Sequence, residues 1–472
     1  MSEAVEGIQV EESGSLPANW ARARLPEIAA TNPTLDKSEI DDDILVSFVP
    51  MPAVEAETGG IDVSAHRKFA EVKKGYTGFL EGDVLFAKIT PCMENGKMAV
   101  VPALKNNLGF GSTEFHVLRP AGNISPTLLY YFVSSKAFRI EAERNMTGAV
   151  GQRRVPTAFL SESEIPLPPA AEQVRIVAKL EELFSELDKG VENLRTAQQQ
   201  LKVYRQALLK HAFEGKLTGA TESSTWKTLP LGTLLEFLTS GSRGWAKYYA
   251  DEGDIFIRAQ NIKHDWLDLS DIAFVSLPER AEGLRTRVRK GDLLITITGA
   301  NVTKSALVET DPGTAYVSQH VALCRPTEAI LPKYLYWFVI AETAGRKQLN
   351  DMAYGAGKPG LNLENIRSVI VPLPELQQQE EVVELIEDKL SVIDQLENTI
   401  TTSLQQAEAL RQSILKKAFS GQLVPQNPED EPASVLLERI RAEREAQPVA
   451  KRPRKPTATA ASTPEVVTEV KA

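Results

Sequence analysis

The chain of 472 residues is too long for a single ordinary domain and suits two to four. Its composition, 42% apolar and 25% charged residues, is that of a soluble globular protein. No apolar stretch follows a basic start, and the most apolar run, Tyr334–Ala341, is too short to span a bilayer, so we expect neither a signal peptide nor membrane binding. The two cysteines, Cys92 and Cys324, exclude a disulfide framework and a cysteine-rich zinc site, and we expect a cytoplasmic protein.

The net charge of −10 is unevenly distributed along the chain. Residues 1–15 carry four acidic and no basic side chains, and residues 372–424 carry nine acidic and four basic ones. Residues 16–165, with 16 basic and 18 acidic groups, and residues 219–371, with 17 of each, are close to neutral. The acidic total therefore does not exclude a nucleic-acid partner, because local patches decide what each part binds.

In chain order, a polar tail (1–15) precedes a first globular domain (16–165). Within this domain an alternating strand is expected after the Gly82-Asp83 turn, and residues 127–145 have the pattern of one amphipathic helix. A cluster of prolines then ends the domain and opens a long helical segment, 166–218. The first half of the chain is thus predicted to be a mixed domain followed by a helix.

The second half of the chain repeats the first with a shift of 206 residues. Trp20 corresponds to Trp226, and the sequence IPLPPAAEQ from Ile165 corresponds to VPLPELQQQ from Val371. The repeat predicts a second globular domain (219–371) and a second helical segment (372–424). In the second domain, strands are expected over Asp254–Ile262 and after the Gly291-Asp292 turn.

Both helical segments carry apolar residues in steps of three and four, the pattern of a coiled-coil seam. In the first segment these seam residues are Leu180, Phe184, Leu187, Val191, Leu194 and Leu201. In the second segment they are Ile386, Leu390, Ile393, Ile400 and Leu404. Each segment ends at a glycine suited to a left-handed cap, Gly215 or Gly421. At about 40 residues, each helix would be ~60 Å long, so we expect an antiparallel pair that serves as a spacer; the core of an ordinary bundle is the alternative.

The predicted fold is therefore α+β, with two tandem mixed α/β domains related by a pseudo-twofold axis and separated by two long helices that form an antiparallel coiled coil. The remaining residues, 425–472, are predicted to form a short helix with Leu436, Leu437 and Ile440 on one face, followed by a basic low-complexity tail. We expect this helix to pack on a partner subunit or on the first domain. The tail either adds nonspecific attraction to nucleic acid or is simply solvated.

Loops rich in hydrogen-bond donors lie between the predicted strands of both domains. They comprise residues 90–97, 148–154, 241–249, 283–292, 298–305 and 355–360, with Trp245, Tyr248 and Tyr249 interleaved. Arg, Lys, Gln, Asn, Ser and Thr are the donors that proteins use on phosphates and base edges. Any one of these loops is explained as a solvated turn, but their concentration in both copies favours nucleic-acid binding.

The sequence carries no convincing catalytic or metal site. The glycines of Gly355–Gly360 have dinucleotide-binding spacing, but Pro359 lies where the helix would begin its second turn. Residues Gly299–Ser305 lack the glycine that a phosphate-binding loop needs directly before Lys304. The five histidines have no partners at metal-ligand or catalytic-triad spacing. We therefore expect no catalytic residue and no bound metal.

Several segments together resemble the specificity subunits of type I restriction-modification enzymes. They are IPLPPAAEQVRIVAKLEELFSELD from Ile165, the duplicated helix ends AFEGKL and AFSGQL, the Gly-Asp-aliphatic-Leu strands, and IRAQNI from Ile257. The resemblance covers the chain from Leu16 to about Ala446. One departure is that Gln378 in the second copy stands where the first copy has Glu172.

The resemblance implies a DNA-reading subunit that is not itself an enzyme and needs no cofactor of its own. Each globular domain would recognise one half of an asymmetric, bipartite double-stranded DNA sequence, and the helices would fix the unspecified spacer between the halves. Two modification (methyltransferase) subunits would dock and bring S-adenosylmethionine for adenine methylation. Restriction subunits would bring ATP-driven translocation and cleavage, with Mg²⁺.

On this hypothesis, donors on the loops of both domains are the candidate contacts to bases or phosphates. In the first domain they are Lys88, Lys97, Gln152, Arg153 and Arg154. In the second domain they are Arg243, Lys247, Arg258, Asn261, Lys304 and Lys358. The main alternative is a coiled-coil scaffold or dimerisation protein without DNA specificity. A self-contained restriction or methylation enzyme is disfavoured by the missing catalytic motifs.

Overall fold

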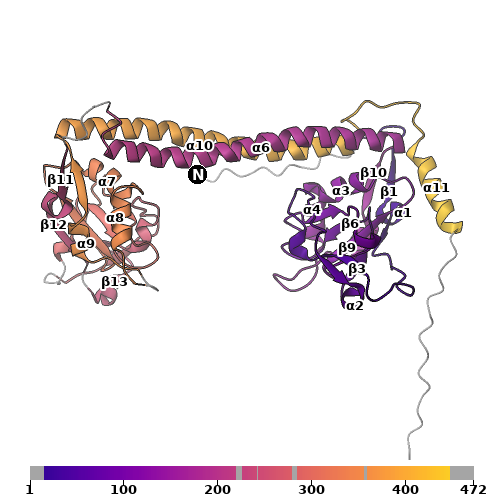
Figure 1. Ribbon diagram of the computed structural model, residues 1–472, viewed down its shortest axis with the longest axis horizontal. Coiled ribbons are helices and arrows are strands. Elements are labelled where there is room, and N and C mark those ends of the chain that lie inside the picture. The colour runs from indigo at the N-terminus through magenta and orange to yellow at the C-terminus, as the bar shows by residue number, and fades with distance from the viewer. Residues whose placement is uncertain (1–14, 219–225, 242, 279–283, 356–358, 447–472) are drawn as a thin grey trace, which may run out of the picture. The chain divides into compact units, whose positions relative to one another are not determined.

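The computed structural model describes residues 15–218, 226–241, 243–278, 284–355 and 359–446. The chain forms two compact units. The first unit combines Met1–Asp188 with Ala407–Ala472, and the second is Lys189–Gln406. Each unit contains one globular domain and parts of both long helices (Figure 1). Each long helix is therefore divided between the two units.

Two four-stranded sheets and one two-stranded sheet form the first globular domain. The first sheet has the antiparallel order β2 (Ala29–Thr31), β9 (Phe115–Pro120), β6 (Val84–Ala87), β7 (Met98–Val100). The second has the order β4 (His66–Lys68), β3 (Leu45–Val49), β8 (Gly109–Gly111), β5 (Thr77–Phe79), and only β3 and β8 are parallel. At the end of the domain nearest the long helices, β1 (Ala21–Arg24) pairs with β10 (Glu164–Leu167), with Ala23 opposite Ile165.

The helices of the first domain are short. They are α1 (Leu25–Ile28), α2 (Phe69–Val72), α3 (Pro126–Ser134), α4 (Lys136–Arg144) and α5 (Thr157–Glu162), with 3-10 turns at Met51–Ala53 and Lys105–Asn107. The prediction of one continuous helix over 127–145 is wrong, because the backbone leaves the helix at Ser135, where ψ is 144°. The hydroxyl of Ser135 accepts a hydrogen bond from the amide of Phe138 and caps the second helix.

The second globular domain repeats this architecture. Its antiparallel sheet has the order β12 (Leu235–Ser240), β19 (Val321–Pro326), β16 (Leu293–Thr296), β17 (Ser305–Leu307). Its mixed sheet has the order β13 (Tyr249–Ala250), β15 (Ala273–Val275), β14 (Asp254–Ile257), β18 (Ala315–Val317), in which β14 and β18 are parallel as β3 and β8 are. The two-stranded sheet joins β11 (Lys227–Pro230) to β20 (Ile370–Leu373). The duplication read from the sequence is thus a duplication of topology.

The helices of the second domain are α7 (Pro332–Ile340), α8 (Gly345–Met352) and α9 (Leu363–Arg367), with 3-10 turns at Leu231–Leu234, Trp245–Tyr248, Ala259–Ile262 and Leu284–Thr286. The strand expected over Asp254–Ile262 ends at Ile257, and the chain turns directly after it. The cause is Asn261, whose side-chain oxygen accepts a hydrogen bond from the amide of Arg258 at 2.9 Å and closes the turn.

The two long helices are α6 (Ala170–Phe213) and α10 (Leu376–Phe419), each of 44 residues. In the first unit, the beginning of α6 runs antiparallel to the end of α10 (Figure 1). Ile176, Leu180 and Phe184 share a core with Ile414, Leu415 and Ala418. Arg411 forms an ion pair with Asp188 and lies over the ring of Phe184.

In the second unit, the end of α6 packs against the beginning of α10 in the same antiparallel way. Leu208, Leu209 and Phe213 share a core with Ile386, Leu390 and Ile393. Arg205 forms ion pairs with Asp394 and Glu397. Among the residues expected along the seam, Leu180, Phe184, Ile386, Leu390, Ile393 and Ile400 are buried, and Leu187, Val191, Leu194, Leu201 and Leu404 are half-buried. The predicted antiparallel pairing is confirmed within each unit.

Both long helices end at the glycine caps that the sequence predicted. Gly215 and Gly421 have φ of 70° and 73°, the left-handed region. The amide of Lys216 donates to the carbonyl of His211, and that of Gln422 to the carbonyl of Lys417, both at 2.9 Å, as in a Schellman cap. None of the described helices is both long enough and apolar enough to cross a bilayer.

The C-terminal helix α11 (Ala433–Ala446) packs on the first domain, which is one of the two locations expected for it. Leu436, Leu437 and Ile440 belong to the core of that domain. Arg441 donates to the carboxylate of Glu27 at 2.6 Å. The predicted basic tail lies outside the described residues.

Candidate nucleic-acid interface

A short hairpin, residues 147–154, presents polar side chains on the first domain. Thr147 and Arg154 exchange two backbone hydrogen bonds of 2.9 and 2.8 Å. Gly148 and Gly151 turn the chain at φ of 120° and 78°, a region that side chains disfavour. Gln152 is exposed, and its side chain bonds none of the residues that the structure describes. The amide group of Gln152 is therefore available to an external partner.

Glu114 lies among the basic candidates at the base of this hairpin. Both Nε and Nη2 of Arg154 lie 2.9 Å from its carboxylate oxygens. This pairing lowers the pKa of Glu114. The backbone of Lys88 also donates to the Glu114 carbonyl at 2.9 Å. The structure thus brings Lys88 and Arg154 together, but Arg154 is occupied by a carboxylate that the sequence analysis did not identify.

Arg153 lies farther from its neighbouring carboxylates than Arg154 does from Glu114. Its guanidinium lies 3.7 Å from Glu143 and 4.0 Å from Glu94, and 39% of its side chain is exposed. The buried ring of His116 fixes the chain directly after the arginines, with its Nε2 2.9 Å from the carbonyl of Val155. Burial lowers the pKa of His116, so the ring is neutral at neutral pH and serves as a structural support.

Two of the candidate DNA contacts, Lys97 and Asn261, make hydrogen bonds to backbone carbonyls within their own domains. The ammonium of Lys97 donates to the carbonyls of Val54 and Met51 at 2.8 and 3.3 Å and holds a loop in place. Asn261 is only 3% exposed, and its amide nitrogen donates to the carbonyls of Asp268 and Asp271. Both N–H groups of the Asn261 amide are thus used within the protein, whereas the Lys97 ammonium has three N–H groups and uses two of them on these carbonyls.

Two further basic candidates of the second domain pair with carboxylates. Arg258 donates to the carbonyl of Asp271 at 2.9 Å and lies 3.2 Å from its carboxylate. Lys304 lies 3.2 Å from the carboxylate of Asp265, which also binds the buried Arg346 at 2.5 Å. The ion pair with Asp265 thus offsets the free-energy cost of burying Arg346. Lys304 and Arg346 share this one carboxylate.

Arg243 and Lys247 are exposed on one segment of the second domain. The ammonium of Lys247 lies 4.8 Å from the centre of the Tyr248 ring. Trp245, one of the aromatic residues interleaved with the donors of this loop, is 5% exposed and stacks on Phe256 at 5.5 Å, so its role is structural. Lys358 lies outside the described residues.

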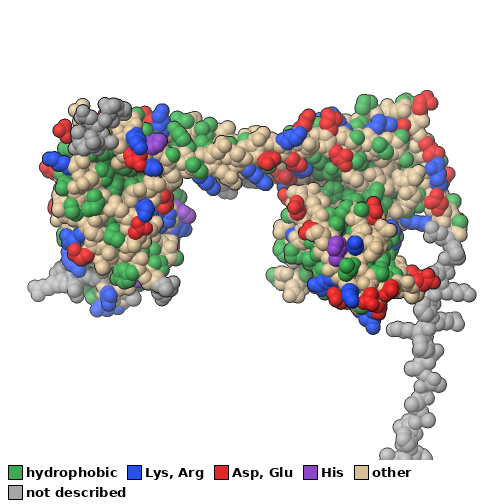
Figure 2. Space-filling model, viewed as in Figure 1, with side chains coloured by type: hydrophobic (Ala, Val, Ile, Leu, Met, Phe, Trp, Pro, Cys, Tyr) green, Lys and Arg blue, Asp and Glu red, His purple; other side chains and the backbone are tan. Residues whose placement is uncertain are grey.

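Three arginines of the donor-rich loop 283–292 in the second domain were not among the individual candidate contacts. Arg285, Arg287 and Arg289 are exposed, and Thr286 and Val288 between them are buried. The alternation R-T-R-V-R, typical of an extended segment with one solvent face, was the available signal. Figure 2 shows basic and acidic side chains interspersed on the face that it draws.

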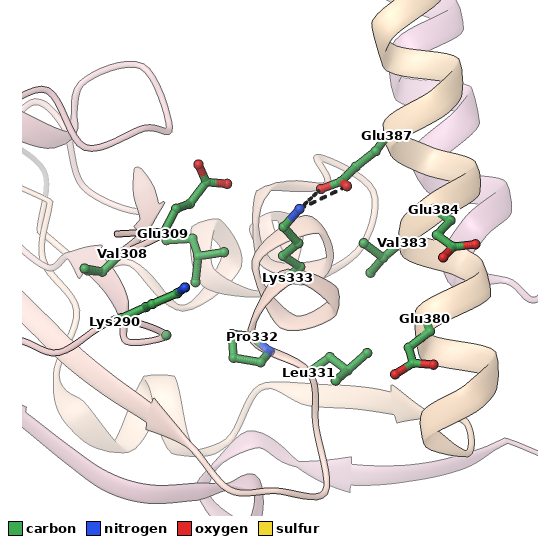
Figure 3. A pocket seen from close by; sticks show the side chains of 12 residues that line it. Lys290, Val308, Glu309, Leu331, Pro332, Lys333, Glu380, Val383, Glu384 and Glu387 are labelled. Carbon is green, nitrogen blue, oxygen red and sulfur yellow. Dashed lines mark hydrogen bonds and ion pairs between the residues drawn. The ribbon is translucent and has the colours of Figure 1, made fainter. Parts of the chain in front are cut away.

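A groove of about 600 Å³ lies within the second unit, between α10 and the globular domain (Figure 3). Its apolar lining consists of Leu307, Val308, Leu331, Pro332 and Val383. Its charged lining consists of Glu309, Glu380, Glu384, Glu387, Lys290 and Lys333. Lys333 is paired with Glu387 at 2.7 Å, which leaves the groove acidic on balance. No group of three or more metal-binding side chains occurs in the part of the chain that the structure describes.

Comparison with known sequences identifies relatives of both halves of the chain. A family model described as the type I restriction modification DNA specificity domain matches residues 17–194 and again 223–406. The EcoAI specificity subunit of Escherichia coli is 42% identical over 180 residues, which are 38% of this chain and 30% of that protein. The EcoKI specificity subunit of Escherichia coli K12 is 30% identical over 351 residues, 70% of this chain and 74% of the relative. The chain thus spans less than a third of the EcoAI relative.

Solved structures share the fold. A chain from a structure of a type I restriction-modification system has a TM-score of 0.72 at 22% identity, covering 87% of this chain and all of the other. The HsdS subunit of Thermoanaerobacter tengcongensis has a TM-score of 0.56 at 21% identity, covering 88% of this chain and all of that one.

Proposed function

The chain belongs to the type I restriction-modification DNA specificity family, and from this premise we propose that it is the DNA-recognising subunit of such an enzyme. Each globular domain reads one part of a split double-stranded DNA sequence. The chain carries out no chemistry itself, and it directs the methylation of adenine and the restriction of DNA by partner subunits. We place this complex in the cytoplasm, where it meets DNA.

One observation carries the proposal of a split, asymmetric target. Both domains have the same two four-stranded sheets, but the polar side chains on equivalent loops differ. The hairpin 147–154 carries Gln152 and Arg153, whereas the sequence has Lys358 and Pro359 at the equivalent positions of the second copy. Base edges are distinguished by the donors and acceptors that face them. Two equal scaffolds with different donors therefore suit two different half-sequences.

The long helices suit the role of a spacer between the two half-sequences. At 44 residues, each helix is about 66 Å long at 1.5 Å per residue. Half-sites one helical turn apart are separated by about 34–36 Å. An antiparallel helix pair of this length would be long enough to determine how many unspecified base pairs separate the half-sequences.

We assign the groove of the second unit to a methyltransferase subunit. The groove has an apolar floor around Val383 and a rim with more glutamates than lysines. It suits an apolar side chain that is flanked by Lys or Arg on the partner. At equivalent positions of the first unit, Val174 and Ala178 replace Glu380 and Glu384. The two copies of the partner would thus share an apolar contact and differ in the surrounding charge.

The partners would supply every cofactor. S-adenosylmethionine would enter with two methyltransferase subunits, and ATP and Mg²⁺ with restriction subunits. Flipping of the target base is likewise a task for the methyltransferase.

The proposal is tested by methylation-aware sequencing of the host genome with and without this gene. We expect methylated adenines in one split sequence, present only with the gene, and co-purification of a methyltransferase with the chain. A scaffold protein without DNA specificity would leave the methylation pattern unchanged, and that result would overturn the proposal.

A further inference from the structure

The segment Arg285–Arg289 contains three exposed arginines, which we call the arginine row. Its residues alternate between exposed arginines and the buried Thr286 and Val288. Val288 donates from its backbone to Ala315 at 2.8 Å, and Arg287 forms a bridge with Tyr316 of β18. The segment therefore lies along the edge of the mixed sheet. Arg285 lies in the 3-10 turn Leu284–Thr286, and the chain continues along the sheet edge from Arg287. Alternate residues of an extended chain are about 6.6–6.8 Å apart, which is the spacing expected between Arg287 and Arg289.

The cations of this row are not neutralised within the described residues. No ion pair joins Arg285, Arg287 or Arg289 to a carboxylate in the described ranges. Arg285 donates instead to the neutral hydroxyl of Thr239 at 2.7 Å, which orients the first member of the row. The nearby carboxylate of Asp292 is occupied, because it accepts two hydrogen bonds from Arg325, each 2.8 Å long.

The basic candidates of the first domain behave differently. Arg154 pairs with Glu114, and Arg153 lies near two glutamates. Elsewhere in that domain, Lys68 pairs with Asp43 and Lys73 with Asp42. These four cations of the first domain are thus paired with its own carboxylates, whereas Arg285, Arg287 and Arg289 have no such pairing within the described residues.

The fold does not require arginines at these positions. In the first domain, β5 occupies the same edge, and Gly78 lies opposite Phe110 as Arg287 lies opposite Tyr316. The amide of Leu80 donates to Asp83 as that of Arg289 donates to Asp292. The three equivalent positions of the first domain are Tyr76, Gly78 and Leu80. The arginine row is therefore a feature that the second domain has and its structural copy lacks.

We propose that this row binds consecutive phosphates of the DNA backbone, so that the second domain supplies the larger part of the salt-dependent affinity for DNA. This inference rests on the proposed function and adds which surface holds the backbone. Guanidinium groups bind phosphate oxygens through two parallel hydrogen bonds. Because phosphates are the same at every base pair, the row adds affinity without adding sequence preference.

The test compares the chain, purified with its methyltransferase, with the variant R285Q/R287Q/R289Q. DNA affinity is measured on the recognised duplex and on an unrelated duplex between 50 and 200 mM salt. Each lost phosphate contact reduces the slope of log affinity against log salt by about 0.9, so we expect a reduction of about 2.7. A fourfold rise in salt lowers the affinity of both proteins for DNA. The factor by which it lowers the affinity of the native chain would then be about 40 times the factor for the variant. Methylation-aware sequencing should find the recognised sequence unchanged.

A matched control removes three arginines whose groups are bonded within the first unit. In R439Q/R441Q/R444Q, the lost partners are Glu431, Glu27 and the carbonyl of Pro26. We expect this variant to keep the native salt slope. The triple Arg→Lys variant of the row should also keep most of the slope, because lysine retains the charge. If the triple glutamine variant does not fold, R287Q alone should reduce the slope by about 0.9.

A native slope in the triple glutamine variant would overturn the inference. So would loss of the methyltransferase at an unchanged slope, because the row would then bind an acidic protein surface. If the native complex binds no DNA at all, the proposed function fails, and that outcome is distinct from both.

Discussion

The indole nitrogen of Trp20 donates a 2.9 Å hydrogen bond to the carboxylate of Glu172, which is 1% exposed. Gln426 donates to the same carboxylate at 2.6 Å. Glu172 therefore joins the start of the first domain, the first turn of α6 and the segment after α10. The second copy has Gln378 here, as the sequence comparison noted. The two hydrogen bonds that Glu172 accepts, from Trp20 and Gln426, account for a carboxylate at this position of the first copy.

Replacement of Glu172 by glutamine should change how stability depends on pH. Burial raises the pKa of Glu172, so the native state binds its proton more tightly than the unfolded chain does. Its contribution to stability is therefore greatest below the ordinary pKa of about 4.5 and falls as the pH rises through the raised value. We expect the unfolding free energy of the native chain, minus that of E172Q, to decrease over this range. Urea unfolding at several pH values measures it; E181Q, at an exposed position of the same helix, is the control.

Lengthening both long helices together should lengthen the spacer of the recognised sequence. The pairing of Arg205 with Asp394 places the Ala197-Gln198 bond opposite the Thr401-Thr402 bond. Seven helical residues inserted at each site preserve the coiled-coil seam and add about 10.5 Å, the length of about three base pairs. Methylation-aware sequencing should find the same half-sequences with about three more unspecified base pairs between them. An unchanged spacer would show that the helices do not set the separation.

Truncation of Leu436 in α11 should destabilise the first unit selectively. This side chain is 2% exposed in the core of the first domain, and the cavity left by Leu→Ala costs about 2–5 kcal/mol. The matched control is V435A on the same helix, where 38% of the side chain is exposed. Hydrogen exchange should show faster exchange in β1 and α1 of L436A and native rates in the second domain. Equal effects of the two variants would contradict this packing.

Charge reversal at the groove should weaken one of the two proposed methyltransferase contacts. Glu380 and Glu384 lie on its rim, whereas Glu381 and Asp388 are exposed on the same helix outside the lining. We expect E380K/E384K to co-purify with one methyltransferase copy where the native chain has two, because like charges would meet across the contact. The control E381K/D388K should retain both copies by native mass spectrometry. If both variants retain two methyltransferase copies, the groove is not part of the interface.

Alanine at Gln152 should relax the recognised sequence at one position. Its amide is the exposed group at the hairpin turn that bonds no described residue, and a bidentate amide–adenine contact contributes about 1–3 kcal/mol of discrimination. We expect the methyltransferase bound to Q152A to methylate sequences that vary at a single position in one half-sequence. A uniform loss of affinity on all sequences would identify a phosphate contact instead.

The features that the sequence predicted correctly are those with a local signal. The seam of the long helices follows from a 3.5-residue spacing, and the caps at Gly215 and Gly421 follow from a residue type. The pairing partners of the basic candidates could not be predicted in this way. Arg154 meets Glu114 across 40 residues and Lys304 meets Asp265 across 39, and no periodicity connects such positions. The interruption at Ser135 was missed because serine is tolerated within helices as well as at their ends.

The first unit is assembled from two separate stretches of chain, residues 1–188 and 407–472, whereas the second is a single stretch, 189–406. During synthesis on the ribosome, every residue of the second unit is therefore made before the first unit can be completed. Until Leu436, Leu437 and Ile440 emerge, the apolar surface that they cover remains open to water. A nascent chain stopped before residue 407 would thus hold a complete second unit beside an unfinished first one.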